Sequence, residues 1–351
     1  TDQEIRQILE RQIDADRWTN LDRQLARDAY RTGIIDLAPH ADRQPDEFHA
    51  LKIGRLRKLE GLGLADEIGP SQWTISQKAE ATLRELGERG DIIKRIHHGL
   101  TARGIARGAA SYVLASESLN DPVIGRLVAR GLDDELKGTA FAVVDGVDGR
   151  THHIKLPDAA GDSAPGSIVE LRKFDDARGQ RRVAIAVRSD LDIERQVTAT
   201  GATWLDRQNI AREPVALGGG FGAEVRDAMD RRAEHLVGQG LAERQNRGVS
   251  FQPGLVDTLR RRELDAVAEK IAAETGRPQV KPQPGEYVTG TYQRRLTLAT
   301  GRFAMLDEGL GFSLVPWSPS LERQLGKHVS GVARGDGGVD WSFGRQRGLG
   351  L

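Results

Sequence analysis

The spacing of hydrophobic residues along this chain changes from a helical period to the alternation of strands, and it does so twice. Few architectures accommodate such an order. Helical spacing prevails over residues 1–105 and again over residues 200–278. Apolar and polar residues alternate over residues 121–190 and 285–351. Because these two periods belong to α-helices and half-buried strands, we expect an α+β multi-domain protein with these four parts.

The first part has the element order of a winged helix-turn-helix. A short strand at residues 34–37 separates a helical lead-in from an amphipathic helix over residues 45–62. A β-ribbon around the turn at Gly69 follows, and then a long helix over residues 77–100. The order of helix, strand, helix, ribbon and helix predicts a winged helix within residues 1–105.

The alternating parts predict small barrels. Five short runs, separated by Gly, Asp and Pro turns, fall within about 70 residues: "VIGRLVARGL", "TAFAVVDG", "RTHHIKL", "SIVELRKF" and "RVAIAVRS". Short strands at this spacing are typical of a closed five-stranded barrel of the OB or SH3-like kind. Similar runs follow residue 285, so a second barrel is expected there.

The two halves of the chain also resemble each other. "LEGLGLADEIGPSQWTISQKAEATLREL" is similar to "LVGQGLAERQNRGVSFQPGLVDTLRRREL", and "GTAFAVVDG" is similar to "GRFAMLDEG". The second match places Phe141 opposite Phe303 and Asp145 opposite Asp307. We therefore expect a winged helix followed by a small barrel to occur twice, with chance matching of short Gly-rich motifs as the alternative.

Composition excludes several classes of protein. Cysteine is absent, which removes disulfides, Cys-ligated zinc and thiol catalysis and fits a cytoplasmic location. No run approaches about 18 consecutive apolar residues, so no membrane span is expected. Lys+Arg and Asp+Glu number 51 each, so affinity for nucleic acid has to come from local clusters. The chain starts inside a helical pattern without Met, and we expect it to be part of a longer protein.

A cluster of cations marks the amphipathic helix as a candidate recognition helix. Between Ala50 and Leu59 it carries four positive charges and no acid, namely Lys52, Arg55, Arg57 and Lys58. The interval of three between Lys52, Arg55 and Lys58 predicts a basic outer face, suited to the major groove of duplex DNA. Arg95 and Arg103 are expected to extend this contact along the DNA backbone. A solvated helix face in a winged helix that binds protein is the alternative.

The Gly-rich C-terminal tail is a second candidate surface. It combines an aromatic ring with three cations, which suits an extended contact with single-stranded nucleic acid or with a partner protein. The tail residues are Arg334, Trp341, Arg345 and Arg347. Phe141, Tyr292 and Trp317 on the predicted barrels are further candidates for stacking on unpaired bases, with packing in the core as the alternative.

No motif predicts a metal site, a cofactor or a catalytic residue. His97 and His98 diverge by about 100° on a helix, and His152 and His153 point to opposite faces of a strand, so neither pair chelates one ion easily. The run from Gly218 to Ala223 fits G-x-G-x-x-A, but the strand before it is short. We expect this run to lead into a helix rather than to bind a dinucleotide.

The stretches "GRLRKLEGLGLADEIGPSQWTISQKAEATLRELGERGDIIKRIHHGL" and "GRFAMLDEGLGFSLVPWSPSLERQLGKHVSGVARGDGGVDWSFGRQRG" carry a resemblance to a known group. The chain resembles, over essentially its whole length, the C-terminal region of VirD-like relaxase/mobilisation nucleases of conjugative elements, a domain of unknown function. "LVPWSPSLERQLGKHVSG" and "DWSFGRQRG" are the most specific parts of the match.

The resemblance implies a non-catalytic role in conjugative DNA transfer. Full-length members of the group combine an N-terminal nicking domain, with a Tyr nucleophile and a His-bound metal, with a region like this one. None of the chain's tyrosines lies in such a context, so no catalytic residue carries over. The implied role is DNA binding and scaffolding within a relaxase. The rival is a protein-interaction module that docks the relaxase to relaxosome accessory proteins or to a type IV secretion coupling protein.

Overall fold

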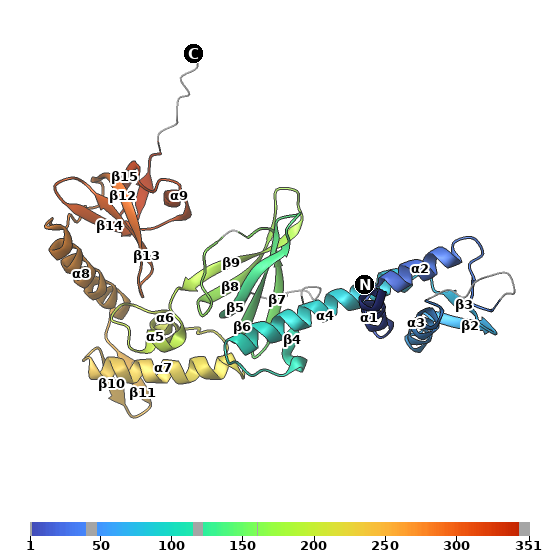
Figure 1. Cartoon of the computed structure of the whole chain (residues 1–351). Coiled ribbons are helices and arrows are strands. Elements are labelled where there is room, and N and C mark those ends of the chain that lie inside the picture. Colours follow the sequence, from blue (N-terminus) through green and yellow to red (C-terminus); the bar gives the residue numbers. More distant parts are fainter. Residues whose placement is uncertain (1, 40–47, 115–121, 160, 344–351) are drawn as a thin grey trace, which may run out of the picture. The chain divides into compact units, whose positions relative to one another are not determined.

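The computed structural model describes residues 2–39, 48–114, 122–159 and 161–343. The structure is mixed α and β with several separate sheets (Figure 1). The chain divides into two compact units, Thr1–Ala102 and Arg103–Leu351, named below the N-terminal unit and the C-terminal unit.

The N-terminal unit consists of helices and one small antiparallel sheet. Its helices are α1 (Asp2–Ile13), α2 (Asn20–Ala29), α3 (His49–Gly61) and α4 (Ala79–Ala102). Its strands are β1 (Ile35–Asp36), β2 (Ala65–Gly69) and β3 (Gln72–Ile75), paired in the order β1-β3-β2. Helices α3 and α4 confirm the two predicted helices, although Pro45, where the first was expected to begin, lies outside the described residues.

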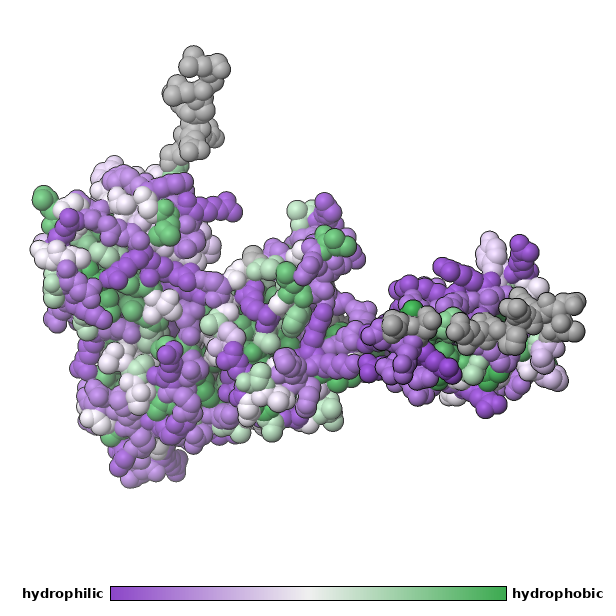
Figure 2. Space-filling view, in the orientation of Figure 1, coloured by the Kyte–Doolittle hydropathy of each residue, from purple (hydrophilic) through white to green (hydrophobic). Residues whose placement is uncertain are grey.

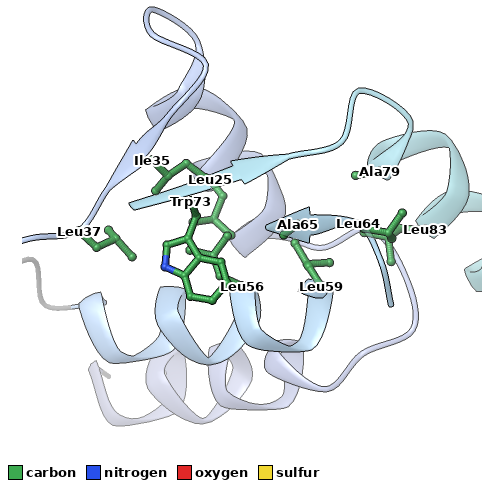
Figure 3. Close-up of a cluster of buried hydrophobic side chains, with 10 residues drawn as sticks. All are labelled: Leu25, Ile35, Leu37, Leu56, Leu59, Leu64, Ala65, Trp73, Ala79 and Leu83. Carbon is green, nitrogen blue, oxygen red and sulfur yellow. The ribbon is translucent and has the colours of Figure 1, made fainter. Parts of the chain in front are cut away.

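The core of the N-terminal unit forms between α2, α3 and this sheet. Trp73 of β3 is 2% exposed and lies among Leu25 of α2, Leu56 of α3 and Ile35 of β1 (Figure 3). The cluster extends to Leu83 of α4. The sheet is held over α3 by burial of these apolar side chains, each of which contributes about 1.5–3 kcal/mol when fully buried.

The C-terminal unit begins with a six-stranded sheet. After the short 3₁₀ helix η1 (Ala109–Ser111), its strands are β4 (Tyr112–Val113), β5 (Val123–Asp134), β6 (Thr139–Gly146), β7 (Thr151–Leu156), β8 (Ile168–Asp175) and β9 (Arg181–Ser189). They pair in the order β4-β7-β6-β5-β8-β9. All neighbours are antiparallel except β4, which runs parallel to β7. The five predicted strands are therefore confirmed as β5 to β9.

Helices and a hairpin follow the first sheet. They are α5 (Ile193–Val197), α6 (Trp204–Ile210), α7 (Phe221–Gly238), β10 (Ala242–Gln245), β11 (Gly248–Phe251) and α8 (Leu255–Thr275). Phe221 and Val225 of α7 pack in one cluster with Trp204 of α6 and Ile168 of the first sheet. Helix α8 confirms the helix predicted over residues 255–275, and α7 confirms the one predicted over residues 222–239 within one residue at each end.

A second sheet of five antiparallel strands ends the unit. Its strands are β12 (Tyr287–Thr297), β13 (Arg302–Asp307), β14 (Phe312–Pro316), β15 (His328–Ala333) and β16 (Val339–Trp341), with helix α9 (Pro319–Glu322) between β14 and β15. They pair in the order β14-β13-β12-β15-β16. The first sheet has the same order over β7-β6-β5-β8-β9.

The prediction of closed barrels is wrong, because neither sheet closes over the residues that the structure describes. Closure would require β7 to pair with β9, but β4 occupies the outer edge of β7. In the second sheet the residues before β12 take the same edge of β14, where Val280 donates its backbone N–H to the carbonyl of Phe312 at 2.7 Å. An edge that is already paired cannot accept the strand that would complete a barrel.

Hydrophilic and hydrophobic side chains are interspersed over the face of the molecule shown in Figure 2. Within the described ranges, no helix is long and apolar enough to cross a membrane.

Candidate nucleic-acid interface

Arg55, the central cation of the predicted recognition helix, is fully buried. Its guanidinium donates to both carboxylate oxygens of Asp22, at 2.8 and 2.9 Å. Its other N–H groups donate to the backbone carbonyls of Ile13, Ala15 and Arg17. Because all five guanidinium donors are used inside the protein, Arg55 fastens the α1–α2 segment to α3 and does not reach the surface where a base would lie.

The other two cations of the predicted basic face also pair with aspartates. Lys52 is 8% exposed and lies 2.9 Å from Asp28. Lys58 is partly buried and lies 3.1 Å from Asp16. The prediction of an outward basic face is therefore wrong for Lys52 and Arg55. The three cations are spaced three residues apart on α3, and their aspartate partners are spaced six residues apart on the α1–α2 segment. This pairing neutralises the row of positive charges on α3.

Exposed cations are found elsewhere in the N-terminal unit. Arg57 lies on the exposed side of α3, and Lys94, His97 and His98 are exposed on the C-terminal half of α4, beside the partly buried Arg95. No acid occurs between Ile92 and Ala102. One turn earlier on α4, Asp91 is engaged by Arg17 at 2.6 Å. Four exposed basic side chains of this unit are named below the α4 basic surface: Arg57, Lys94, His97 and His98.

The remaining predicted contacts lie in the C-terminal unit or beyond the described residues. Arg103 is exposed and is the first residue of the C-terminal unit. Arg334 is paired with Asp336 at 3.1 Å and with Asp340 at 3.2 Å. Trp341 packs against the core of the second sheet and stacks on Phe343, with ring centroids 6.2 Å apart. Arg345 and Arg347 lie outside the described residues.

Two of the aromatic candidates for base stacking are occupied within the protein. Phe141 stacks on His153 with ring centroids 5.5 Å apart. Tyr292 is fully buried, and its hydroxyl donates to Glu322 at 3.3 Å. Burial and the carboxylate of Glu322 raise the pKa of Tyr292.

A second buried arginine in the C-terminal unit repeats the bonding of Arg55. Arg232 of α7 is fully buried and donates to both carboxylate oxygens of Asp206, at 2.8 and 2.9 Å. Its other bonds reach the carbonyls of Val197, Ala199 and Gly201. These lie six, four and two residues before Thr203, as Ile13, Ala15 and Arg17 lie before Thr19.

The chain around each arginine–aspartate pair follows the same pattern. Thr19 with Asp22 and Thr203 with Asp206 both form capping boxes at the start of a helix. The sequence signal is "RQI" then "TNLDRQ" at residues 11–24, and "RQV" then "TWLDRQ" at residues 195–208. The similarity of these two stretches is visible in the sequence. The arginines that bind the two aspartates lie on other helices, so the sequence does not show that they are equivalent.

The two sheets share a pair of contacts as well. Arg107 donates to Asp145 at 3.0 Å before the first sheet, and Arg277 donates to Asp307 at 2.6 Å before the second. A glycine faces each aspartate: a Cβ at Gly125 would lie 2.5 Å from the carbonyl oxygen of Asp145, and a Cβ at Gly290 would lie 2.8 Å from that of Asp307. Only glycine fits such a close approach.

A cavity of about 830 Å³ lies between the two sheets of the C-terminal unit. Its charged lining consists of four arginines and three acids, namely Arg130, Arg188, Arg295, Arg302, Asp162, Asp190 and Glu322. Trp317 lies in the wall, with the guanidinium carbons of Arg295 and Arg302 at 5.2 and 5.3 Å from its ring centroid. Sequence reasoning found Trp317 but missed the cavity, because its residues come from five separate segments of the chain.

Ion pairs clamp the two sheets together at this cavity. Arg302 donates to both carboxylate oxygens of Asp190, at 2.8 and 2.7 Å, and lies 3.0 Å from Asp162. Asp162 also lies 2.5 Å from Arg295. Burial opposes ionisation of Asp162, but the hydrogen bond from Arg295 and the charges of both arginines outweigh it and hold its pKa below the ordinary value.

The histidine pair on β7 and the glycine run before α7 make contacts within the protein. His152 bonds Asp148 at 2.9 Å, and among the residues that the structure describes no group of three or more His, Cys, Asp or Glu could hold a metal ion. Gly220 precedes the first residue of α7, and Gly218 donates its N–H to the carbonyl of Val147 at 2.7 Å. The glycine run therefore leads into a helix and packs on the turn after β6.

Comparison with known protein families gives a match over residues 52–178 and again over residues 170–350. The chain belongs to the DUF3363 family, whose description is "protein of unknown function". The two matched segments of this DUF3363 chain together include most of α3, all of α4, both sheets and the cavity. No curated protein and no solved structure matches the chain.

Proposed function

We propose that this chain is a non-catalytic DNA-binding and scaffolding segment of a relaxase that acts in conjugative DNA transfer. The resemblance of its sequence to the C-terminal region of VirD-like relaxases supports the context. The α4 basic surface supports the activity, and it is the observation that carries the proposal. Duplex DNA presents a dense row of phosphates, and exposed cations without compensating acids are what such a row attracts.

In the proposed contact with duplex DNA, α3 contributes one side chain rather than its whole row of cations. Lys52 and Arg55 hold α3 in place, and Lys58 is paired with Asp16. Arg57 stays exposed on α3, and Lys94 supplies an exposed positive charge from α4. The contact is therefore mainly with phosphates, and we expect modest sequence preference, because phosphate contacts position a protein without reading bases.

We further propose that the chain contains two copies of a winged helix followed by a curved sheet. The first copy combines α2, β1, α3, β2 and β3 with the first sheet, and the second combines α6, α7, β10 and β11 with the second sheet. The matching bonds of Arg55 and Arg232 support this, as do the matching strand orders. Unrelated units would have no reason to share the same three carbonyl acceptors at the same offsets.

The DNA-binding proposal is tested by charge reversal in the full chain. Arg57→Glu/Lys94→Glu is compared with wild type by fluorescence anisotropy on a labelled 20-base-pair duplex. If each cation neutralises one phosphate, the slope of log affinity against log salt should fall by about 0.9 per cation. Affinity at low salt should fall at least about tenfold.

A matched control separates this surface from the total charge of the unit. Lys78→Glu/Arg84→Glu also reverses two exposed cations, one just before α4 and one in its N-terminal half. It changes the net charge of the protein by the same amount. Equal loss of affinity in both variants would contradict the α4 basic surface as the contact.

Docking to a partner protein is the second candidate function, and one observation favours it. On the second winged-helix copy two exposed cations are paired with acids: Arg231 lies 2.7 Å from Glu194 and 2.8 Å from Asp227, and Arg244 pairs with Glu234. A neutral, ion-paired helix face gives DNA little attraction. It suits an accessory or coupling protein, whose binding should depend far less on salt.

A further inference from the structure

The outer face of α2 carries a row of arginines that the proposed duplex contact does not use. Arg23, Arg27 and Arg31 follow one another at four-residue intervals, and all three are exposed. Residues four apart on an α-helix lie on the same side, about 6 Å apart along its axis. Like charges at this spacing repel one another, so their proximity does not itself stabilise α2.

The positive charge of this row is not neutralised within the protein. Among the residues that the structure describes, the guanidinium groups of Arg27 and Arg31 have no hydrogen-bond or ion-pair partner. Arg23 donates to the side-chain amide oxygen of Asn20 at 3.2 Å, and a neutral amide leaves its charge uncompensated.

The acids of α2 are engaged elsewhere. Asp22 is fully buried in its pair with Arg55, and Asp28 lies 2.9 Å from Lys52. Both aspartates therefore face α3, whereas the arginines of the row are exposed. An anionic ligand would meet the row without first displacing a carboxylate.

An exposed aromatic ring lies next to two of these arginines. Tyr30 directly precedes Arg31 and comes three residues after Arg27, and it is 89% exposed. Within the described part of the chain its ring neither stacks on another ring nor lies against a cation. Tyr30 thus presents a free aromatic surface to solvent between two cations that are also free.

Hydrogen bonds fix the backbone beneath these side chains. Tyr30 keeps helical backbone angles, and its N–H donates to the carbonyl of Arg27 at 3.2 Å. The N–H of Gly33 donates to the carbonyl of Ala29 at 2.7 Å, which continues the helical turn past Arg31. A ligand would therefore have to order side chains but no backbone, which lowers the cost of binding.

The second arginine–aspartate unit shows that the shared architecture does not require these residues. Its helix α6 starts from an equivalent capping box at Thr203 but has seven residues, whereas α2 has ten. The positions eight, eleven and twelve residues after the capping threonine are Arg27, Tyr30 and Arg31 in the first unit and Ala211, Pro214 and Val215 in the second. The extension of α2 therefore serves the N-terminal unit alone.

We propose that the outer face of α2 binds single-stranded nucleic acid, with a base stacked on Tyr30 and the neighbouring phosphates at Arg27 and Arg31. Stacking on aromatic rings combined with cations along the backbone is the general mode of single-strand binding. A duplex fits less well, because its bases are stacked inside the helix and cannot lie against the ring. The site is separate from the duplex contact, whose cations are on α3 and α4.

The test uses the full chain and fluorescence anisotropy with labelled ten-nucleotide oligothymidylate and oligouridylate. In Arg27→Gln/Arg31→Gln the slope of log affinity against log salt should fall by about 1.4, since each contact with a single strand contributes about 0.7. Tyr30→Ser should weaken binding about fivefold or more, and Tyr30→Phe should match wild type because it keeps the ring. Binding of either probe with this pattern supports the site, and the tighter probe tells whether DNA or RNA is preferred.

Two control variants make the result specific. Lys78→Gln/Arg89→Gln also removes two exposed cations of the N-terminal unit, one just before α4 and one within it, and should leave the slope unchanged. Arg57→Glu/Lys94→Glu, which tests the duplex contact, should leave oligothymidylate binding in place. Loss of single-strand binding in this last variant, with none in the α2 variants, would overturn the present inference while leaving the duplex proposal intact.

Other outcomes would also overturn the proposal. Binding of neither oligonucleotide would do so, as would equal loss in Tyr30→Ser and Tyr30→Phe. A polyglutamate peptide offers charge without a base, so binding as tight as that of oligothymidylate would show that stacking plays no part.

A further measurement uses only wild-type protein. It is cross-linked by ultraviolet light to an oligonucleotide that contains 5-iodouracil, and the cross-linked peptides are identified by mass spectrometry. Cross-links at Tyr30 or within residues 20–33 support the α2 site. Cross-links confined to the C-terminal unit would refute it.

Discussion

Asp22→Ala should destabilise the N-terminal unit more than any surface change, because it leaves the Arg55 guanidinium buried without its counter-charge. Removing one partner of a buried ion pair costs about 3–5 kcal/mol. Asp22 also accepts the N–H and the hydroxyl of Thr19 at the start of α2, and loss of such a cap costs about 1 kcal/mol. The expected loss is therefore about 4–6 kcal/mol, comparable to the whole stability of many domains of this size.

Hydrogen exchange followed by mass spectrometry on the full chain measures this loss and locates it. Peptides from residues 2–39 and 48–102 should exchange much faster in Asp22→Ala, and those from the C-terminal unit should not change. Asp16→Ala is the matched control, since Asp16 is 67% exposed and its partner Lys58 is 30% exposed, and it should cost at most about 1 kcal/mol.

A double replacement tests the reasoning from the opposite direction. Asp22→Leu/Arg55→Met removes both charges from the core, and buried pairs replaced by apolar side chains of similar volume are often neutral or stabilising. Its exchange should lie much closer to wild type than that of Asp22→Ala. A single variant that costs less than about 1 kcal/mol, or a double variant as unstable as the single one, would refute the account of Arg55.

Three other predictions concern the C-terminal unit. The pKa of Asp162 is held below the ordinary aspartate value of 3.8. The ion pairs of Asp162 with Arg295 and Arg302 therefore stabilise the fold above that pH, and this stabilisation is lost as the pH falls through the lower folded value. Thermal unfolding should show this dependence in wild type and lack it in Asp162→Asn. Burial and the charge of Arg232 lower the pKa of His235 from 6.5. The contribution of neutral His235 to the free energy of unfolding is therefore complete above that pH and declines as the pH falls toward the folded value. In His235→Gln, urea unfolding should lose this decline. In Gly201→Ala the new methyl group would overlap the carboxylate of Glu263, which should cost about 1–3 kcal/mol in the same urea assay and loosen the β12–β13 loop. An unchanged unfolding curve in any of these variants would contradict the contact it removes.

Helices and strands were predictable because their periodicity survives in the sequence. The helix over residues 255–275 was predicted with its observed bounds, and the alternating runs correspond to β5 to β9. Closure of the sheets was not predictable from these runs. The strand that takes the free edge of β7 is the two-residue β4, which is too short to leave a pattern.

The sequence contains a sign that Lys52, Arg55 and Lys58 on α3 face the protein rather than solvent. Lys52, Arg55 and Lys58 at three-residue spacing have counterparts in three aspartates at six-residue spacing upstream, Asp16, Asp22 and Asp28. A helix that meets another segment along its length pairs such rows. Charge alone indicated a face for DNA, and only the packing of α2 against α3 shows that this face is internal.

The cavity could not be predicted from the sequence at all. Arg130, Asp162 and Arg302 are separated by long stretches of chain, and no local motif joins them.

The most direct test of the central claim is the affinity of the full chain for a 20-base-pair duplex at salt concentrations from about 50 to 200 mM. About two phosphate contacts, from Arg57 and Lys94, would give a slope near −1.8 and a roughly 12-fold loss of affinity over that range. That result would support DNA binding through the α4 basic surface. Absence of binding at the lowest salt concentration, or binding that does not change with salt, would contradict it and favour docking to a partner protein.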